Sequence, residues 1–284
     1  MPQHYLMLTA SVIMFGIQFR LNQIYEKHAG STSRATFVFI SGYSVFGLII
    51  LLLINGLHFE FTLFSLIMAI LTALDFIACS YFSIKAFSVV NISLFSIFSM
   101  LGGMLLPFVT GILFYREGLN AGKIVCILLL IAAVAVTFEK GKKNKGMLYC
   151  IGVFIFNGMS GVLSKIFQSA PFAKTNEAVY SVMCTIATGV IAAVLLLFTK
   201  GDRVRLNKRA VAAMSFYGVI NRVANYLLLL ALAALPASVQ YPFVTGGVII
   251  VSVAIGLMTG QKPSKREIIS VLLSGAGIAA LLII

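Results

Sequence analysis

The chain has 284 residues, of which 60% are hydrophobic and only 10% charged, and its mean hydropathy is +1.05. Soluble domains carry about 25% charged residues, so this chain cannot cover a soluble surface with polar side chains. The formal net charge is +13. Because Lys and Arg cluster between apolar runs, this charge indicates membrane topology and contact with anionic lipid headgroups, not nucleic acid.

Ten apolar runs follow one another along the chain, and a membrane-spanning helix needs about 20 apolar residues. Strands of a membrane barrel would be about ten residues long with strict alternation, which these runs do not show. The first run lacks a basic flank and a small-residue cleavage site, so we expect a retained helix. The sequence therefore predicts an all-α polytopic membrane protein, with helices over residues 5–25, 34–55, 62–86, 91–114, 120–138, 147–167, 178–199, 210–232, 237–258 and 266–284.

Two halves of the chain resemble each other weakly. Residues 91–120 align with residues 236–265, and the same offset pairs Ser93 with Ser238 and Gly102 with Gly247. We therefore predict two five-helix repeats, residues 1–140 and 141–284. Because five is odd, the second repeat is expected to lie inverted relative to the first. Inverted repeats with a binding site near the bilayer midplane characterise many secondary transporters.

Lys and Arg are distributed unevenly between the two sides of the predicted bundle. The breaks after the odd-numbered helices hold fifteen of them, whereas the opposite side holds four: Arg116, Lys123, Lys165 and Lys174. Cytoplasmic loops of membrane proteins carry an excess of Lys and Arg. The count therefore predicts a multi-pass protein of the cell inner membrane with the odd-numbered breaks in the cytoplasm and both termini outside.

The stretch FVTGILFYREGLNAGKIVCILLLIAAVAV (108–136) joins a small-residue apolar helix, a short turn with Glu117 and a Gly/Ala-rich helix. This unit resembles the EamA-like group of the drug/metabolite transporter (DMT) superfamily. Residues 251–282 resemble the same unit, with Gln261 and Lys262 in place of the usual Gly-Glu. The resemblance covers the whole chain and implies ten helices and a transport function. It also implies cytoplasmic termini in many members, the reverse of what the charge count predicts here.

Three charged residues lie well inside the predicted spans: Arg20, Asp75 and Arg222. A charge at a helix centre costs about 2.5–3.5 kcal/mol on insertion scales, so such residues usually face a cavity or a partner. Asp75 aligns with Ile220, two residues from Arg222, which predicts similar depth across a pseudo-two-fold axis. Either Arg222 binds an anionic group in a midplane pocket with Asp75 as the balancing or coupling group, or the two form a structural ion pair. Arg20, near a helix end, can reach the interface.

Other polar residues inside the spans are candidates for lining the same pocket. Residues three and four apart share a helix face, and Pro242 can free backbone carbonyls toward a cavity. We predict a substrate-binding set of Arg222, Asn221, Asn225, Tyr226, Tyr81, Gln18, Asn22, Gln240 and Tyr241. Two further small-residue stripes fit helix packing better than a binding site. They are Asn157, Ser160 and Ser164, and Ser96, Ser99 and Gly103.

The sequence favours transport over enzymatic chemistry. The three histidines are scattered, no pair of acids lies within a span, no nucleotide motif is present and the four cysteines have no metal-binding spacing. We therefore expect no catalytic residues, metal or cofactor. We predict a secondary active transporter of a small anionic or zwitterionic metabolite, working by alternating access with possible proton coupling. Two alternatives stay open: a proton-coupled exporter of cationic drugs that uses Asp75, and a translocator of lipids or lipid-linked sugars.

Overall fold

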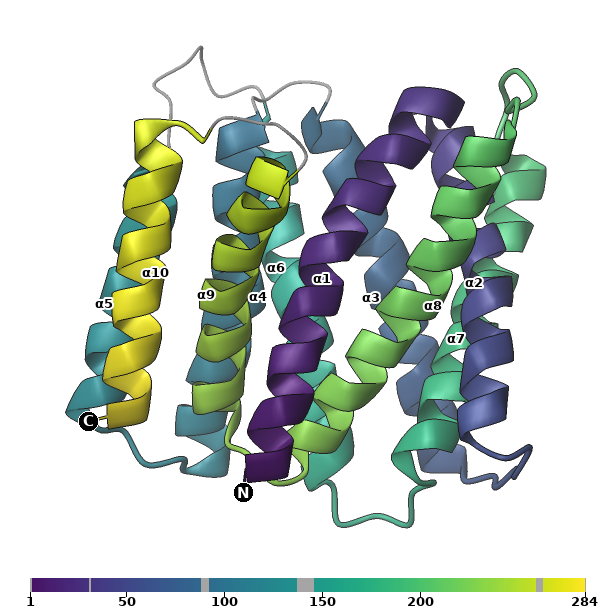
Figure 1. Ribbon diagram of the computed structural model, residues 1–284. Helices are drawn as coiled ribbons and strands as arrows, with labels where there is room; N and C mark the ends of the chain where they lie inside the picture. The colour runs from purple at the N-terminus through teal and green to yellow at the C-terminus, as the bar shows by residue number, and fades with distance from the viewer. Residues whose placement is uncertain (1, 31, 88–91, 137–145, 259–262, 284) are drawn as a thin grey trace.

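Ten α-helices make up the computed structural model, which describes residues 2–30, 32–87, 92–136, 146–258 and 263–283 (Figure 1). The predicted helices and the all-α fold are confirmed. Most boundaries agree with the sequence prediction within two residues, and the first helix is longer at both ends. The helices are α1 (Pro2–Ala29), α2 (Ser33–Ile54), α3 (Leu63–Phe87), α4 (Ile92–Tyr115), α5 (Ala121–Val136), α6 (Met147–Ser169), α7 (Glu177–Phe198), α8 (Lys208–Leu232), α9 (Ala237–Met258) and α10 (Lys265–Ile283).

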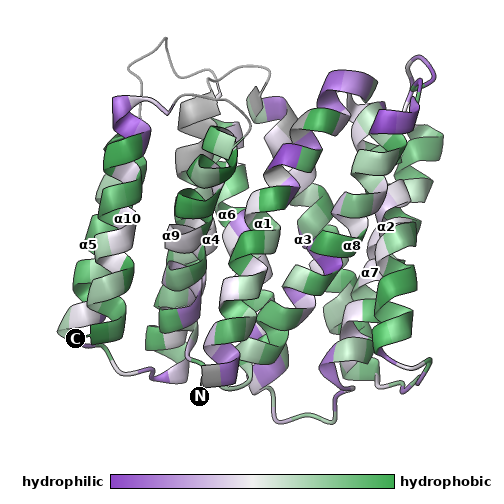
Figure 2. Ribbon diagram, in the orientation of Figure 1, coloured by the Kyte–Doolittle hydropathy of each residue, from purple (hydrophilic) through white to green (hydrophobic). Residues whose placement is uncertain are grey.

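Eight of these helices are long and apolar enough to cross a membrane, namely α2, α3, α4 and α6 to α10. Helix α5 has 16 described residues, which is short for a span, and α1 has 28 residues but is more polar. Figure 2 shows hydrophobic residues along the middle of the helices and hydrophilic residues gathered at their ends. This distribution is the one expected for helices surrounded by lipid.

Polar caps fix where several helices begin. The side chains of Thr32, Asn176 and Asn207 each accept a hydrogen bond from the backbone N–H three residues later. At the start of α10, Ser264 and Glu267 bond reciprocally through side chain and backbone, a capping box. These caps satisfy N–H groups that have no partner within the helix. The polar breaks of the sequence therefore set the helix starts at the edges of the bundle.

Small residues let helices α4 and α6 approach closely. A β-carbon on Gly102 would lie 2.1 Å from the backbone oxygen of Phe154. Asn157 Nδ2 donates to the backbone oxygen of Ser99 at 2.6 Å. Ser160 and Ser164 donate to carbonyls of their own helix, and the side chain of Ser96 lies outside the described residues. The structure thus supports helix packing as the role of both small-residue stripes.

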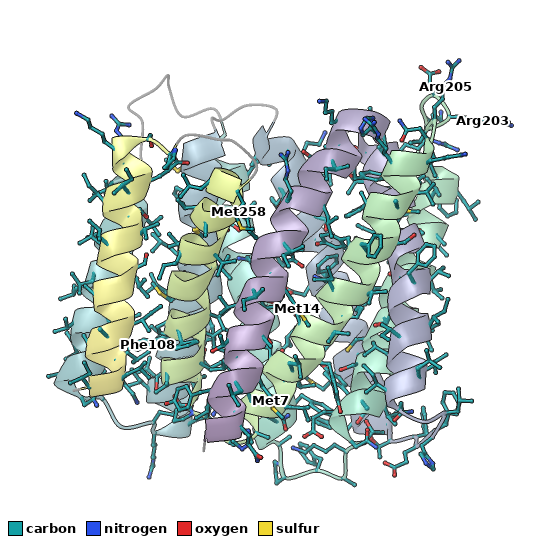
Figure 3. All side chains as sticks on the ribbon, in the orientation of Figure 1. Met7, Met14, Phe108, Arg203, Arg205 and Met258 are labelled. Atoms are coloured by element: carbon teal, nitrogen blue, oxygen red, sulfur yellow. The ribbon has the colours of Figure 1, made fainter. Side chains whose placement is uncertain are left out.

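The two chain ends lie at one edge of the bundle, together with the connections that follow α2, α4, α6 and α8 (Figure 1). The C-terminal ends of the odd-numbered helices lie at the opposite edge, with the described connection between α7 and α8, where Figure 3 shows Arg203 and Arg205. We call the edge with the two chain ends the terminal edge, and the opposite edge the basic edge. Several basic-edge residues of the charge count fall outside the described residues: Lys140, Lys142, Lys143, Lys145 and Lys262, with Gln261.

Candidate functional site

Arg222 of α8 points toward α2, where its guanidinium carbon lies 5.4 Å from the centre of the Tyr43 ring. A β-carbon on Gly47 of α2 would lie only 2.4 Å from the Arg222 side chain, so a glycine there makes room for it. Nε and Nη2 of Arg222 are buried and have no hydrogen-bond partner among the described residues. The cation–π contact with Tyr43 stabilises the positive charge, and Nε and Nη2 can still donate hydrogen bonds to another group.

Asp75 of α3 is 6% exposed, and both of its carboxylate oxygens lack a hydrogen-bond partner among the described residues. The predicted ion pair between Asp75 and Arg222 is therefore not formed in this structure. Sequence alignment placed the two residues at similar depth but could not specify the direction of either side chain. Unpaired charges in an apolar interior are costly and are usually retained for function.

Gln18 and Asn221, two predicted pocket residues, contact each other. Asn221 Nδ2 donates to Gln18 Oε1 at 2.8 Å, which joins α8 to α1. About two helical turns earlier in α1, Ser11 Oγ donates to the backbone oxygen of Ala224 at 3.0 Å. Asn225 is exposed and donates to the backbone oxygen of Asn221. The chain neighbour of Arg222 thus belongs to a polar contact between helices that come from the two predicted repeats.

Gln240 and Tyr241 are both buried near the start of α9. Gln240 Nε2 donates to the backbone oxygen of Leu228 at 3.0 Å, and Tyr241 Oη donates to that of Gly161 at 3.0 Å. These bonds connect α9 to α8 and α6. Helix α9 continues through Pro242, so the proline does not interrupt the helix.

The remaining predicted residues lie apart from these contacts or are only partly enclosed. Tyr81 is 49% exposed, and Lys85 Nζ lies 5.9 Å from the centre of its ring. Asn22 and Tyr226 are half-buried in α1 and α8. The structure therefore brings together Gln18, Asn221 and Asn225, but leaves Tyr81 on an exposed face of α3.

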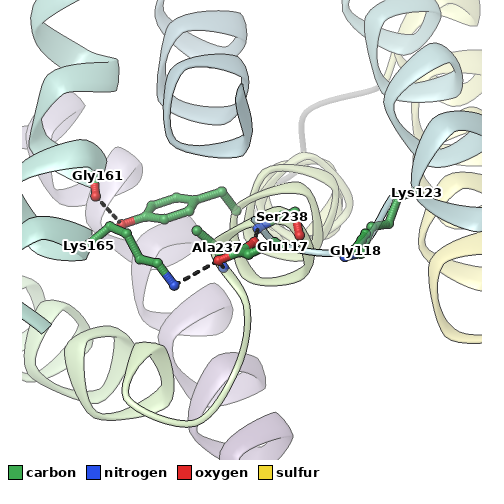
Figure 4. Close-up of polar contacts among 8 residues, drawn as sticks. Glu117, Gly118, Lys123, Gly161, Lys165, Ala237 and Ser238 are labelled. Carbon is green, nitrogen blue, oxygen red and sulfur yellow. Dashed lines mark hydrogen bonds and ion pairs between the residues drawn. The ribbon is translucent and has the colours of Figure 1, made fainter. Parts of the chain in front are cut away.

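A second cluster of charged groups centres on Glu117, in the turn between α4 and α5 (Figure 4). Glu117 Oε1 accepts from Lys165 Nζ of α6 at 2.7 Å and from the backbone N–H of Ala237 at 2.9 Å. Oε2 accepts from the backbone N–H of Ser238 at 2.8 Å. One carboxylate thus neutralises a lysine and caps the first turn of α9, where the helix dipole also favours a negative charge. We call these four residues the Glu117 cluster.

The local backbone aims Glu117 at α9. Arg116 adopts a left-handed φ of 52°, and the Glu117 N–H returns to the backbone oxygen of Gly111 at 3.1 Å. A β-carbon at Gly111 would lie 2.6 Å from Glu117 Oε2, so this position needs a glycine. Burial alone would raise the pKa of the Glu117 carboxyl, but the bonds from Lys165, Ser238 and Ala237 outweigh it and lower that pKa.

Comparison with known proteins identifies the family. Residues 144–283 match the model of the EamA-like transporter family. This part of the chain is an EamA-like transporter domain. The predicted membership of the DMT superfamily is confirmed, and the chain is a multi-pass membrane transport protein of a family that is typically not enzymatic.

Other comparisons add the fold but no substrate. No curated protein sequence matches the chain. A solved structure titled only "Crystal structure of protein" is similar with a TM-score of 0.82 and 12% identity, over 99% of this chain and 96% of that chain. At this identity the likeness shows a shared fold across both halves of the EamA-like transporter.

Sequence reasoning missed the role of the Glu117 cluster. Glu117 stood out only as the family's turn glutamate, and Lys165 only as one charge in the count for the terminal edge. They lie far apart in the sequence, and the two N–H donors come later still in the chain. The one available signal was an acid in a short turn on a side of the bundle that holds few basic residues.

Proposed function

We propose that this transporter is a secondary active carrier that moves a small anionic or zwitterionic metabolite, of amino-acid or organic-acid type, across the inner membrane by alternating access. The observation that carries the proposal is made at Arg222, whose Nε and Nη2 atoms are buried and have no hydrogen-bond partner among the described residues. A guanidinium presents donors in a planar fork that matches a carboxylate or phosphate. A substrate anion would therefore supply what the described protein groups do not.

The polar surroundings support a binding role for this region. Asn221, next to Arg222 in sequence, forms the contact with Gln18 between α8 and α1. We propose that Gln18, Asn221 and Asn225 hold the polar end of the substrate near Arg222. The other predicted residues, Asn22, Tyr81, Tyr226, Gln240 and Tyr241, are proposed to line the path on either side.

Helix neighbours support the proposed repeats, residues 1–140 and 141–284. If α1–α5 are exchanged with α6–α10, the contact of α1 with α8 becomes that of α6 with α3. The contact of α4 with α6 becomes that of α9 with α1, and the contacts α2–α7 and α5–α10 map onto themselves. Such exchange is expected of two inverted repeats around a shared site. The uneven distribution of Lys and Arg supports termini outside the cell.

One alternative has an observation in its favour. Asp75 is 6% exposed and both of its oxygens are unpartnered among the described residues, which suits a site for a cation or a proton. A proton-coupled exporter of cationic compounds would use Asp75 as its substrate site. In the anion proposal, Asp75 is instead the candidate for proton coupling.

A ligand screen sorted by charge tests the proposal. Purified protein is heated with panels of small anions, zwitterions and cations of similar size, because a ligand that binds the folded state raises its melting temperature. We expect anions or zwitterions to stabilise the wild type, and Arg222→Gln to lose at least about 1.4 kcal/mol of binding, a tenfold change in affinity. Arg203→Gln, in the basic-edge loop, is the control. Stabilisation only by cations, lost in Asp75→Asn and kept in Arg222→Gln, would establish the alternative.

A further inference from the structure

The Glu117 cluster connects segments from both proposed halves of the transporter. Glu117 belongs to the α4–α5 turn, whereas Lys165 belongs to α6 and the two N–H donors begin α9. The side chains of Glu117 and Lys165 are 7% and 11% exposed. A single carboxylate therefore holds three segments together through charge-assisted bonds, which are about twice as strong as neutral ones.

The cluster lies at the terminal edge, where a pocket of about 250 Å³ opens beside it. The pocket is lined by Glu117 and Lys165, by Gln168 and Ser169 of α6, and by the turn from Leu232 to Pro236 that leads into α9. One helical turn further into the bundle, Tyr241 bonds to the backbone of α6 and Gln240 to that of α8. The cluster and these two bonds thus follow one another from the pocket toward the interior of the bundle.

The basic edge cannot form the same cluster. In the alignment of the two proposed halves, Glu117 corresponds to Lys262. The first helices of the two halves align at an offset of 142 residues, which pairs Gly16 with Gly158, and at this offset Lys165 corresponds to Gln23. The equivalent acid and its basic partner are both absent from the sequence. The pair formed by Glu117 and Lys165 is therefore not repeated at the equivalent positions of the other half.

From these observations we propose that Glu117 and Lys165 are gating residues, which hold the transporter closed at the terminal edge and must separate in each cycle. The proposal rests on the alternating access proposed above. Because Glu117 binds two N–H groups and Lys165 at once, α9 and α6 cannot move away from the α4–α5 turn until all three bonds break. Weakening the cluster shifts the population toward the state that is open at the terminal edge.

Cysteine accessibility tests this directly. Two reporters are made in a chain with Cys126, Cys150 and Cys184 replaced by alanine. The first keeps native Cys79, one turn from Asp75 toward the basic edge, and the second carries Ser164→Cys with Cys79 also replaced. Ser164 lies beside Lys165 and in contact with Tyr241, behind the cluster. Labelling rates with a water-soluble maleimide are measured in nanodiscs, with no substrate added.

We expect Glu117→Gln to raise the labelling rate of the Ser164→Cys reporter about tenfold and to slow labelling of Cys79. The second variant, Lys165→Met, should have the same effects. Glu267→Gln is the matched control, because Glu267 also accepts a backbone N–H at a helix start but lies at the basic edge. Unchanged labelling at position 164 in both variants would overturn the proposal. A rise at both reporters together would also overturn it, since that result means general loosening. Failure of anion binding at Arg222 would leave these rates unaffected, so the two proposals fail separately.

Discussion

Replacing Glu117 by alanine should destabilise the fold through three contacts at once. The substitution leaves Lys165, 11% exposed, without its carboxylate at 2.7 Å, and it leaves the N–H groups of Ala237 and Ser238 without their acceptors. Removing one partner of a buried ion pair typically costs about 3–5 kcal/mol, because the other charge stays buried and uncompensated. We expect the free energy of unfolding to fall by about this amount.

Related substitutions should rank in a fixed order. Glu117→Gln keeps an oxygen for one N–H but loses the charge, so its cost should be about 1.5–3 kcal/mol, the range for hydrogen bonds to charged groups. Lys165→Met keeps both N–H bonds to Glu117 and should cost less than Glu117→Ala. Unfolding by a denaturing detergent is followed by circular dichroism, because the chain has no tryptophan. A cost below about 1 kcal/mol for Glu117→Ala would refute this account of the cluster.

Three further predictions concern packing, a polar contact and pH. Gly102→Ala should lower the free energy of unfolding by about 1–3 kcal/mol, because its β-carbon would meet a backbone oxygen at 2.1 Å. Gly275→Ala is the control and should not destabilise the fold, because its β-carbon would have nothing within 4 Å. Equal shifts in melting temperature for the two variants would contradict the close packing of α4 against α6. A double-mutant cycle on Gln18→Leu and Asn221→Leu should give a coupling of about 0.6 kcal/mol in denaturation curves, and additive effects would exclude the contact. Folding lowers the pKa of Glu117, so the carboxylate contributes to the stability of the fold above the ordinary carboxyl pKa, and this contribution is lost as the pH falls through the folded-state pKa. The wild type should therefore lose more thermal stability than Glu117→Gln at acidic pH. Parallel profiles of melting temperature against pH would contradict this.

The helices could be predicted because lipid imposes a simple rule on the sequence. Every backbone polar group in the bilayer core must be bonded within a helix, so apolar runs and polar breaks fix the elements. Thr32 and Asn207, for example, cap the starts of α2 and α8, which lie within about two residues of their predicted positions. The small-residue stripes of α4 and α6 were predicted to serve helix packing, and the structure supports this because Asn157 contacts both Ser99 and Gly103.

The site was harder to predict because it depends on side-chain direction. Repeat alignment placed Asp75 and Arg222 at similar depth, but Arg222 turns toward Tyr43 of α2 and the expected ion pair does not form. The Glu117–Lys165 pair joins residues from the two proposed halves, but the sequence singled out Glu117 only as the family's turn glutamate and Lys165 only as one of the counted basic residues. Helical period assigns residues to a face of one helix, but it does not say which neighbour that face meets.

The central claim is that Arg222 binds the negative group of the substrate, and flux through Arg222 variants tests it most directly. Proteoliposomes are loaded with the anion or zwitterion that best stabilises the purified protein, and exchange of labelled ligand is measured for wild type, Arg222→Lys and Arg222→Gln. We predict that Arg222→Gln lowers the exchange rate at least tenfold and that Arg222→Lys, which keeps the charge but not the planar fork, falls between. Wild-type exchange by Arg222→Gln would contradict the account.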